Sequence, residues 1–468
     1  MNRAKRVAFV SLGCAKNTVD SEKMLGQLAE SGCLITADEG EADVIVINTC
    51  GFLDASRREA DEVIREAVAR KGRGGPQRVV VAGCLVQRDK EGLLDRISGI
   101  DALVGVNNRD DVVRAVLGGK RRRRSTPDVF LSDYHPFAQL DTARLRITPR
   151  SYAYLRISEG CDQKCTFCTI PSIRGRMHCK PPQIVLREAR ELIDDGAREI
   201  SLIGQDTTSY GLGDDRFGTG LGGLLRVLDR LDGLGWLRLM YVYPSVLSDD
   251  ILDAVAECEH VCKYIDIPLQ HINDRILKAM HRRIDRAATE RLLDRIRDRI
   301  PGVAIRTTMI VGFPGETDGE FEELLAFVKE FRFDALGAFP YSLEPETPAG
   351  RMGNQVPERV KQQRHHELMS AQQDVAFAQA DRRVGTTFDV LIDEVAEPGL
   401  LVGHHDRQAP VVDGVTYVAP QSAVPGQFIS VRCAARDNYD LIARPAHVGL
   451  PVLSNRSPTP KAASARST

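Results

Sequence analysis

Three cysteines stand close together near the middle of the chain. The stretch EGCDQKCTFCTIP places Cys161, Cys165 and Cys168 with gaps of three and two residues between them. Such crowding suits a disulfide knot, a zinc site or an iron-sulfur cluster. Structural zinc needs four closed ligands, and the next thiol or histidine comes only at His178 and Cys179. An iron-sulfur cluster can leave one iron without a protein ligand, so it fits three thiols better, with zinc as the alternative.

The amino terminus and the cysteine count bear on the disulfide alternative. The chain begins MNRAKRVAFVSLGC, and its apolar run VAFV is too short for a signal-peptide core or a membrane span. We therefore expect a cytoplasmic protein that does not enter the membrane. Eleven cysteines in 468 residues do not make a small disulfide scaffold, and a reducing cytosol disfavours bridges. Clustered thiols then indicate a metal site or catalysis.

Length and charge set broad limits on domain number and partners. At roughly 100 to 200 residues per domain, the chain is long enough for about two to four domains. The formal net charge of −2 gives no general electrostatic reason to expect a polyanionic partner. The longest basic run, Lys120 to Arg124, is followed by STPD. We predict that it belongs to a solvated linker, with phosphate binding as the alternative.

A repeated unit near the amino terminus brings three further cysteines together. Residues 5 to 118 repeat an apolar strand that ends in cysteine: RVAFVSLGC, DVIVINTC and RVVVAGC. Cys14, Cys50 and Cys84 are 36 and 34 residues apart, close to the length of one βαβ unit. Parallel strands present ligands at their carboxyl ends, so these thiols should share one sheet edge. Any single one of them could be a small buried packing residue, the role that we expect for Cys33.

The rest of the chain predicts a barrel followed by a small β module. Residues 147 to 347 alternate helical stretches with six strands: YAYLRISEG, EISLIGQDTTSYG, WLRLMYVYP, YIDIPLQH, AIRTTMIVGFPGE and DALGAFPYS. Six βα units predict an open parallel barrel, and the cysteine stretch follows its first strand, where barrels place their chemistry. Residues 356 to 384 predict a connecting helix, and residues 386 to 445 predict short alternating strands. The last stretch, LSNRSPTPKAASARST, is too polar to fold and should be disordered.

These features together resemble a known family. The C-x3-C-x2-C spacing with Phe167 before the last cysteine is similar to the signature of radical S-adenosylmethionine (SAM) enzymes. The order of the domains resembles the methylthiotransferase family over almost the whole chain, with a last module that looks like a TRAM domain. The fold class is then α/β: a parallel-sheet N-terminal domain, an open (β/α)6 radical SAM barrel and a C-terminal small β-barrel. The implied boundaries are 1–119 for the N-terminal domain, 120–146 for a linker, 147–378 for the radical SAM domain, 379–447 for the TRAM domain and 448–468 for the tail.

The resemblance implies cofactors and site residues. In that family the barrel cysteines hold a 4Fe-4S cluster that binds and reductively cleaves SAM, and the amino-terminal cysteines hold a second cluster tied to sulfur delivery. Carried over, the catalytic set is Cys161, Cys165 and Cys168, and the second metal-binding set is Cys14, Cys50 and Cys84. Residues that fit SAM binding by position are Gln205, Asp206, Gln270, His271, Arg306, Gly312 and Glu316. A structural role as turn residues, or as a buried histidine, is open for each of them.

The substrate branch is predicted from three segments and from charge. Residues 203–211 (IGQDTTSYG), 240–244 (MYVYP) and 412–418 (VDGVTYV) resemble the branch that modifies the β-carbon of an aspartate in small ribosomal subunit protein twelve. The alternative is the branch that modifies a tRNA adenosine. From Thr386 to His447, eight acidic and four basic residues leave a net charge of −4. Because phosphate binding relies on lysine and arginine, we expect this ribosomal protein as partner and no stable tRNA binding. The resemblance also implies an electron donor such as flavodoxin or ferredoxin.

One departure from the family and one alternative of another class complete the predictions. The chain reads RGRMHCKPP, where the family usually has arginine-serine-arginine in place of His178, Cys179 and Lys180. A non-catalytic iron-sulfur factor for ribosome assembly or RNA binding is the alternative function, although a purely structural cluster would normally be closed by a fourth cysteine. The thiols predicted not to bind a cluster are Cys33, Cys179, Cys258, Cys262 and Cys433.

Overall fold

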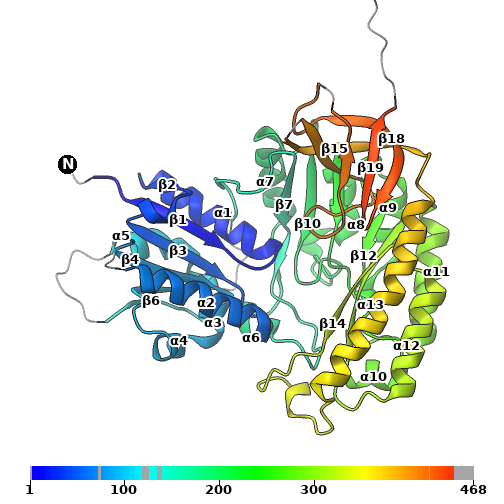
Figure 1. The fold of residues 1–468 in the computed structure, drawn as a ribbon, viewed down its shortest axis with the longest axis horizontal. Helices are drawn as coiled ribbons and strands as arrows, with labels where there is room; N and C mark the ends of the chain where they lie inside the picture. Colours follow the sequence, from blue (N-terminus) through cyan, green and yellow to red (C-terminus); the bar gives the residue numbers. More distant parts are fainter. Residues whose placement is uncertain are drawn as a thin grey trace, which may run out of the picture.

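A computed structural model of the chain describes residues 3–71, 75–118, 126–133, 140–218, 220–397, 399–420 and 422–446. The basic run Lys120 to Arg124 and the predicted tail at 448–468 lie outside the described residues. Three domains follow one another along the chain, and the first and the last lie against different sides of the central barrel (Figure 1). Among the described residues, no helix is long and apolar enough to cross a membrane.

The N-terminal domain is built on a wholly parallel six-stranded sheet in the order β2-β1-β3-β4-β5-β6. Its central strands are runs of valine and isoleucine that are buried on both faces, as expected when helices cover a parallel sheet on both sides. The elements are β1 (Arg6–Ser11), α1 (Ala15–Glu30), β2 (Leu34–Thr36), the 3-10 helix η1 (Glu39–Glu41), β3 (Val44–Thr49), α2 (Asp54–Arg70), β4 (Arg78–Gly83), α3 (Cys84–Asp89), α4 (Gly92–Arg96), β5 (Ala102–Gly105), η2 (Val106–Asp111), α5 (Val112–Leu117) and β6 (Asp128–Phe130).

The three repeated strands predicted from the sequence are β1, β3 and β4, and they are neighbours in the sheet. Strand β6 adds to the far edge of the sheet, although it lies within the segment predicted to be a linker. Its three residues are too short to predict as a strand, because only pairing with β5 identifies them.

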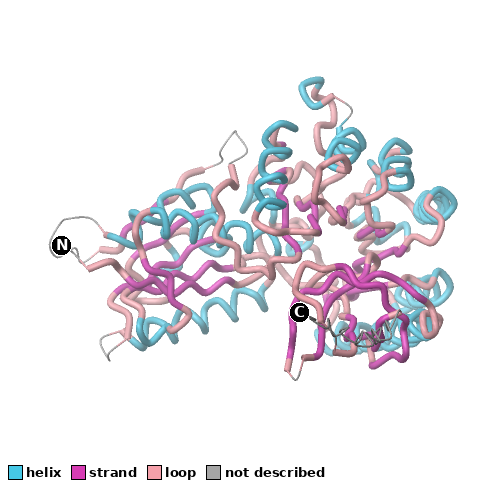
Figure 2. The backbone as a smooth tube through the Cα atoms, turned by 90° about the horizontal axis from the view of Figure 1, so that it is seen from above, coloured by secondary structure: helices cyan, strands magenta, loops and turns pink. Residues whose placement is uncertain are grey.

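The central domain is an open barrel of six parallel strands. Two three-stranded sheets, β11-β10-β7 and β12-β13-β14, meet at a parallel bridge between Leu237 and Val261. Alternate residues on the first strands point to opposite faces. Leu155 and Leu202 pack against the helices, whereas Tyr154 and Ile203 belong to a separate inner cluster. Figure 2 shows the helices on the outer side of these strands.

All six strands predicted for the barrel are present. The elements are β7 (Tyr152–Arg156), β8 (Ser158–Glu159), α6 (Ile170–Arg174), β9 (His178–Cys179), α7 (Pro182–Asp194), β10 (Glu199–Ile203), η3 (Asp215–Phe217), α8 (Gly220–Leu228), β11 (Trp236–Leu239), η4 (Pro244–Val246), α9 (Asp249–Glu257), β12 (Tyr264–Asp266), α10 (Asp274–Ala279), α11 (Arg286–Arg299), β13 (Ala304–Val311), α12 (Asp318–Phe331), β14 (Ala335–Pro340) and η5 (Ala349–Arg351).

The C-terminal module is a closed five-stranded barrel in the order β15-β16-β17-β19-β18. The predicted connecting helix is α13 (Glu358–Asp381), and the predicted boundary at residue 378 falls inside it. The strands are β15 (Thr387–Ala396), β16 (Leu400–His405), β17 (Thr416–Val418), β18 (Phe428–Asp437) and β19 (Asp440–Pro445). Closure leaves no long free edge, and alternate apolar residues fill the interior. The predicted fold class is thereby confirmed for all three domains.

Candidate active site

The barrel cysteines lie on one loop after β7 and β8. Cys161, Cys165 and Cys168 are half-buried free thiols, and the backbone N–H of Ile170 donates to the sulfur of Cys168 at 3.4 Å. Burial raises the pKa of both Cys161 and Cys168 to about 12. Buried thiols of this kind stay protonated unless a metal ion binds the sulfur, because coordination to a metal removes the proton. The loop therefore suits metal binding better than free-thiol chemistry.

Neighbouring segments hold this loop in place. Thr166 donates its backbone N–H to the carbonyl of Met280 at 3.1 Å and its hydroxyl to the carbonyl of Ala279 at 2.8 Å. Arg282 approaches the sulfur of Cys165 with Nη1 at 3.5 Å and stacks on the ring of Tyr243 at 4.2 Å. The guanidinium of Arg282 is therefore held beside the cysteine loop.

The second cysteine set lies along one edge of the N-terminal sheet. Cys14, Cys50 and Cys84 directly follow or come within three residues of the carboxyl ends of β1, β3 and β4. The segments touch: a Cβ on Gly13 would lie 2.9 Å from the Cβ of Cys50, and a Cβ on Gly51 would lie 2.8 Å from the backbone of Cys84. Only glycine allows this approach. The structure thus brings together the three thiols that the repeat predicted.

Arg174 connects the two cysteine sets. It is the last residue of α6, the short helix after Cys168, and its Nη2 lies 3.1 Å from the sulfur of Cys84. The same nitrogen donates to Asn17 Oδ1 at 2.9 Å, and the thiol of Cys84 is 3.4 Å from that oxygen. Arg174 and Cys84 are both buried. The helix that follows one set therefore ends against a ligand candidate of the other.

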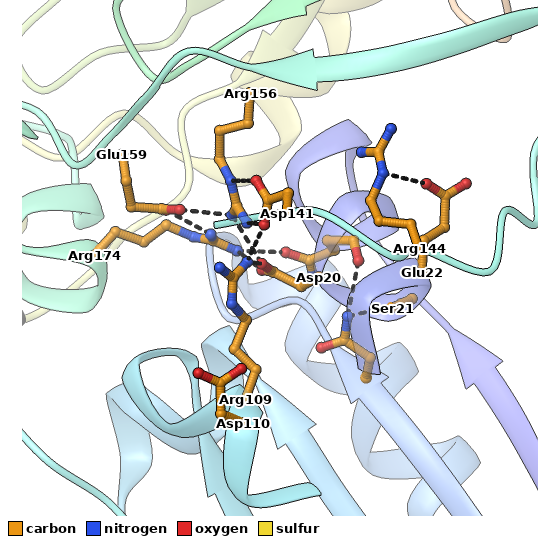
Figure 3. Close-up of polar contacts among 12 residues, drawn as sticks. Asp20, Ser21, Glu22, Arg109, Asp110, Asp141, Arg144, Arg156, Glu159 and Arg174 are labelled. Carbon is orange, nitrogen blue, oxygen red and sulfur yellow. Dashed lines mark hydrogen bonds and ion pairs between the residues drawn. The ribbon is translucent and has the colours of Figure 1, made fainter. Parts of the chain in front are cut away.

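A buried network of charged side chains surrounds Arg174 (Figure 3). Asp20 on α1 accepts from Arg156 of β7 at 2.8 Å and from Arg174 at 2.9 Å, and it also pairs with Arg109. Glu159 accepts from both barrel arginines at 2.6 Å. Removing one partner from such a network leaves an uncompensated buried charge, which is strongly destabilising. The network therefore fixes the N-terminal domain on the barrel.

At His178, Cys179 and Lys180 this chain differs from the usual family sequence. One of these residues, Lys180, takes part in the charged network. Lys180 is buried and donates to Asp141 at 2.6 Å and also pairs with Glu188. Cys179 accepts from the backbone N–H of Gly211 at 3.4 Å. The lysine thus extends the charged network into the barrel wall.

A cavity of about 430 Å³ opens beside Cys14. Its lining comes from all three domains and includes Tyr152 and Tyr154 of the barrel and Val411 of the β module. Tyr241, which follows β11, forms another part of the wall. The interior of the barrel is therefore continuous with the sheet edge that carries the second cysteine set.

Lys16 lies two residues after Cys14 and was not predicted from the sequence. Its side chain is buried, and its ammonium lies 2.9 Å from the centre of the Tyr241 ring. Burial lowers the pKa of Lys16 to about 8. A cation in the first turn of a helix opposes the helix dipole, and this was the signal available in the sequence.

Two of the residues predicted to contact SAM are fully engaged with protein groups. Asp206 is buried and accepts from Gln163 at 2.9 Å and from Ser209 at 2.6 Å, so it ties the end of β10 to the cysteine loop. Glu316 is buried and accepts from the backbone of Gly312 at 2.9 Å and from Arg364 at 2.8 Å.

The other residues predicted to contact SAM are spread along the barrel strands. Gln205 donates to Glu159 at 3.3 Å and Gln270 bridges to β13 through its backbone. Arg306 pairs with Asp266 at 3.0 Å and with Asp413 of the β module at 3.4 Å. Their role in SAM binding stays a prediction. A further candidate, His271, is fully buried with Nε2 3.6 Å from Glu316.

Among the described residues, no group of three or more His, Cys, Asp or Glu side chains converges on a point that could hold a single metal ion. A 4Fe-4S cluster does not require such convergence, because each thiolate binds a different iron. Two sets of three free thiols, each beside an arginine, fit this donor chemistry. Both sets therefore offer the kind of donors that a cluster uses.

The five cysteines predicted not to bind a cluster lie elsewhere. Cys33 packs in the sheet core, Cys258 packs in the barrel core, and Cys262 belongs to the cluster of apolar residues inside the barrel. Cys433 is buried in β18 of the β module, and Cys179 lies in β9. None of the five contacts either cysteine set through a hydrogen bond within the described residues.

Comparison with known proteins identifies the family. Residues 155–328 match the radical SAM superfamily, residues 6–105 match the uncharacterized protein family UPF0004, and residues 384–445 match the TRAM domain. A curated relative from Anaeromyxobacter sp. (strain K), named ribosomal protein uS12 methylthiotransferase RimO, is 43% identical over 445 residues, which cover 94% of this chain and 93% of the relative. The chain belongs to the RimO family.

Other relatives of the RimO family agree. The protein of the same name from Geotalea uraniireducens (strain Rf4) is 43% identical over 94% of this chain and 98% of its own length. Membership confirms the resemblance to the methylthiotransferases and supports the predicted cofactors, SAM and 4Fe-4S clusters. A solved structure of the radical SAM methyltransferase TsrM from Kitasatospora setae matches with a TM-score of 0.51 at 16% identity, over 90% of this chain and 82% of that chain. This likeness concerns the fold alone.

Proposed function

We propose that this RimO family member methylthiolates the β-carbon of an aspartate in ribosomal protein uS12, as a radical SAM enzyme. One observation carries the proposal: the short helix that follows the barrel cysteines ends in Arg174, whose side chain contacts Cys84 of the second set. A reaction that needs both a radical and a sulfur donor requires such an arrangement. The names of the relatives support uS12 as the substrate.

The two sets have separate tasks in this proposal. Cys161, Cys165 and Cys168 would hold the cluster that, when bound, supplies the electron for cleaving SAM into the radical that removes the substrate hydrogen. Cys14, Cys50 and Cys84 would hold the cluster of the sulfur-delivering domain. The protein's own contribution is placement: the Asp20 network fixes the two domains, and the tyrosines of the cavity wall shield the reacting groups from water.

The charge of the β module supports a protein substrate over tRNA. Asp393 and Asp413 are used inside the molecule, where they accept from Ser151 and Tyr264 of the barrel at 2.6 and 2.7 Å. The charged residues of the module that stay exposed among those described are Asp389, Glu394, Glu397 and Asp437 against Arg432 and Arg444. This acidic balance offers little for phosphates and suits a basic protein.

Mass spectrometry of uS12 tests the substrate. In cells that lack this gene, uS12 should lose the methylthio mass on its aspartate, and the gene should restore it. The purified full chain should also bind uS12 and show only weak tRNA binding at two salt concentrations. Tight tRNA binding with a steep salt dependence would favour the tRNA branch. If the reconstituted protein could not cleave SAM, it would instead be a non-catalytic iron-sulfur factor.

The surface over the cysteine loop supports an acidic protein as the electron donor. Residues 161–168, 175–177, 278–283 and 349–351 contact one another around the loop, and together they carry six basic residues and one acidic residue. The exposed cations are Lys164, Arg176, Lys278, Arg283 and Arg351. In the described part of the chain, none of these five forms an ion pair with a carboxylate. An acidic flavodoxin or ferredoxin complements this surface and would approach the cluster at close range.

Charge reversal tests this donor surface. The double variant Lys164→Glu, Arg283→Glu should slow reduction by flavodoxin or ferredoxin at low salt while leaving reduction by dithionite unchanged. Arg230→Glu, an exposed arginine on another part of the barrel, is the matched control and should have no effect. Equal rates in both variants would show that the donor docks elsewhere.

A further inference from the structure

Lys16 differs from the buried cations of the charged network. Among the described residues, Arg109, Arg156, Arg174 and Lys180 all pair with carboxylates at the same domain contact. The ammonium of Lys16 has neither an ion pair nor a hydrogen bond within the described part of the chain; its one polar contact is the face of the Tyr241 ring. A buried cation without an anion is costly unless a ligand supplies the anion.

The carboxylates that act electrostatically on Lys16 already form ion pairs with arginines. Asp266 and Glu159 both act on it electrostatically, but Asp266 pairs with Arg306 at 3.0 Å, and Glu159 accepts from Arg156 and Arg174. Neither is free to serve as its partner. Apart from the thiol of Cys14, which belongs to the second cysteine set, the groups that act on Lys16 leave its charge available to a bound molecule.

Lys16 lies beside the second cysteine set and reaches the barrel wall. It stands in the first turn of α1, two residues after Cys14, and its side chain reaches across to the barrel residue Tyr241. Tyr241 also lines the cavity beside Cys14. The amino end of α1 has no side-chain cap, so its dipole adds to the positive charge at this place.

We propose that Lys16 binds the carboxylate of the aspartate that is modified. The inference rests on the proposed function, because that aspartate is the predicted target. A carboxylate is bonded directly to the β-carbon, so an ion pair at Lys16 holds the reacting C–H between the SAM-binding loop and the sulfur-delivering domain. Lys16 is then a residue that determines specificity: an acidic side chain gains a partner, and a neutral one leaves the ammonium unpaired.

Substrate pairs that differ only in charge test the inference. The holoenzyme is titrated with uS12 and with uS12 whose target aspartate is changed to asparagine, and kcat/KM is measured for both. A charge-assisted hydrogen bond should make the aspartate protein bind and react about 10- to 100-fold better. Lys16→Met should remove this preference, and Lys16→Arg should keep part of it. Lys23→Met is the matched control, because Lys23 lies on the same helix but donates to the carbonyl of Thr142 away from the cavity.

The competing role for Lys16 is to offset the charge of the neighbouring cluster. In that case Lys16→Met would change the iron content or the reduction potential of this cluster and leave the preference for aspartate intact, which would overturn the inference. A Lys16→Met enzyme with normal iron, normal SAM cleavage and no preference would support it. If the unaltered holoenzyme neither bound nor modified uS12, the proposed function itself would fail, and this inference with it.

Discussion

The barrel contacts a domain on each of two sides, and the two contacts use different chemistry. The N-terminal contact consists of arginines and carboxylates around Asp20, with the sulfur of Cys84 at its edge. The C-terminal contact centres on Glu199, which accepts from Arg238 at 2.7 Å and lies 2.9 Å from His404 of the β module. Arginine and aspartate keep their charges across the neutral range, whereas histidine titrates within it.

This difference suggests that the two contacts have different functions. Two clusters that must act on one substrate atom need a fixed separation, and the ion pairs around Asp20 at the N-terminal contact join arginines to carboxylates, with no histidine in these pairs. The C-terminal contact contains a histidine, so its strength can vary with pH. The following predictions test the comparison, starting with the largest effect.

The two cysteine sets should fail in different ways. Replacing Cys161, Cys165 and Cys168 with alanine should abolish both 5′-deoxyadenosine and methylthiolated uS12, because SAM can no longer be reduced. Alanine at Cys14, Cys50 and Cys84 should leave 5′-deoxyadenosine formation largely intact and abolish the modified protein. Both products and the iron content are measured under anaerobic conditions.

The triple variant of the N-terminal domain is the critical one. Full methylthiolation by this variant would contradict a sulfur-delivering role, and its three cysteines would then be packing residues at strand ends. Loss of both products would mean that the N-terminal domain also supports radical formation.

The two sets also differ in how far the sequence predicts them. The barrel set is a local motif, so Cys161 to Cys168 could be recognised without any structure. The N-terminal set depended on the spacing of three strands, and parallel pairing of β1, β3 and β4 then aligned their ends. The assignment of either set as cluster ligands stays a prediction.

Contacts between domains were beyond the reach of the sequence. Nothing local indicates that Arg174 meets Cys84 or that Lys16 meets Tyr241, because those pairs depend on how two domains dock. For the same reason, the sequence did not predict that residues 120–146, assigned to a linker, contain strand β6 and Asp141. Asp141 is part of the charged network. The spacing of apolar residues in a sequence indicates strands and helices, but it does not show how one domain packs against another.

The arginine beside Cys84 should tune the cluster held there. Arg174→Gln removes a charged donor from the sulfur, and a charge-assisted hydrogen bond of about 1.5–3 kcal/mol corresponds to a potential lower by about 60–130 mV for one electron. The midpoint potential is measured by an electron paramagnetic resonance titration of the holoenzyme. Arg109→Gln is the control, since Arg109 pairs with the same Asp20 but does not touch a cysteine.

Both arginine variants should lose stability by about 3–5 kcal/mol, because each removes one cation from the buried network and leaves its carboxylates incompletely compensated. An equal shift of potential in the two variants would assign the effect to the overall charge of the contact rather than to the bond with Cys84.

The C-terminal contact should weaken at alkaline pH. His404 lies between Glu199 and Asp393, and these carboxylates raise its pKa from about 6.5 to about 9 despite its burial. The pKa of His404 is higher in the folded protein than in the unfolded chain. Protonated His404 therefore stabilises the C-terminal contact fully below about pH 6.5, and this stabilisation is lost as the pH rises through about 9. The shift corresponds to about 3 kcal/mol.

The single tryptophan of the chain reports on this contact. The ring centre of Trp236 is 5.8 Å from that of His404 and 4.7 Å from that of Phe428. Its fluorescence should change with a midpoint near pH 9, and His404→Gln should remove the transition. A transition that persists in this variant would point to another titrating group.

The smallest expected effect compares one cysteine on each side of the barrel. Cys84 and Cys262 are both buried, and each has an arginine nearby that acts on it electrostatically. This arginine is Arg174 for Cys84 and Arg238 for Cys262. Only Cys84 lies at a strand end beside other candidate ligands; Cys262 packs among Tyr152, Tyr264 and other residues inside the barrel. Cys262→Ala should therefore leave iron and sulfide unchanged and cost about 1 kcal/mol of stability from the lost packing. Cys84→Ala should lower the iron content by up to one cluster, so a comparable loss of iron from Cys262→Ala would move Cys262 from the packing residues to the ligands.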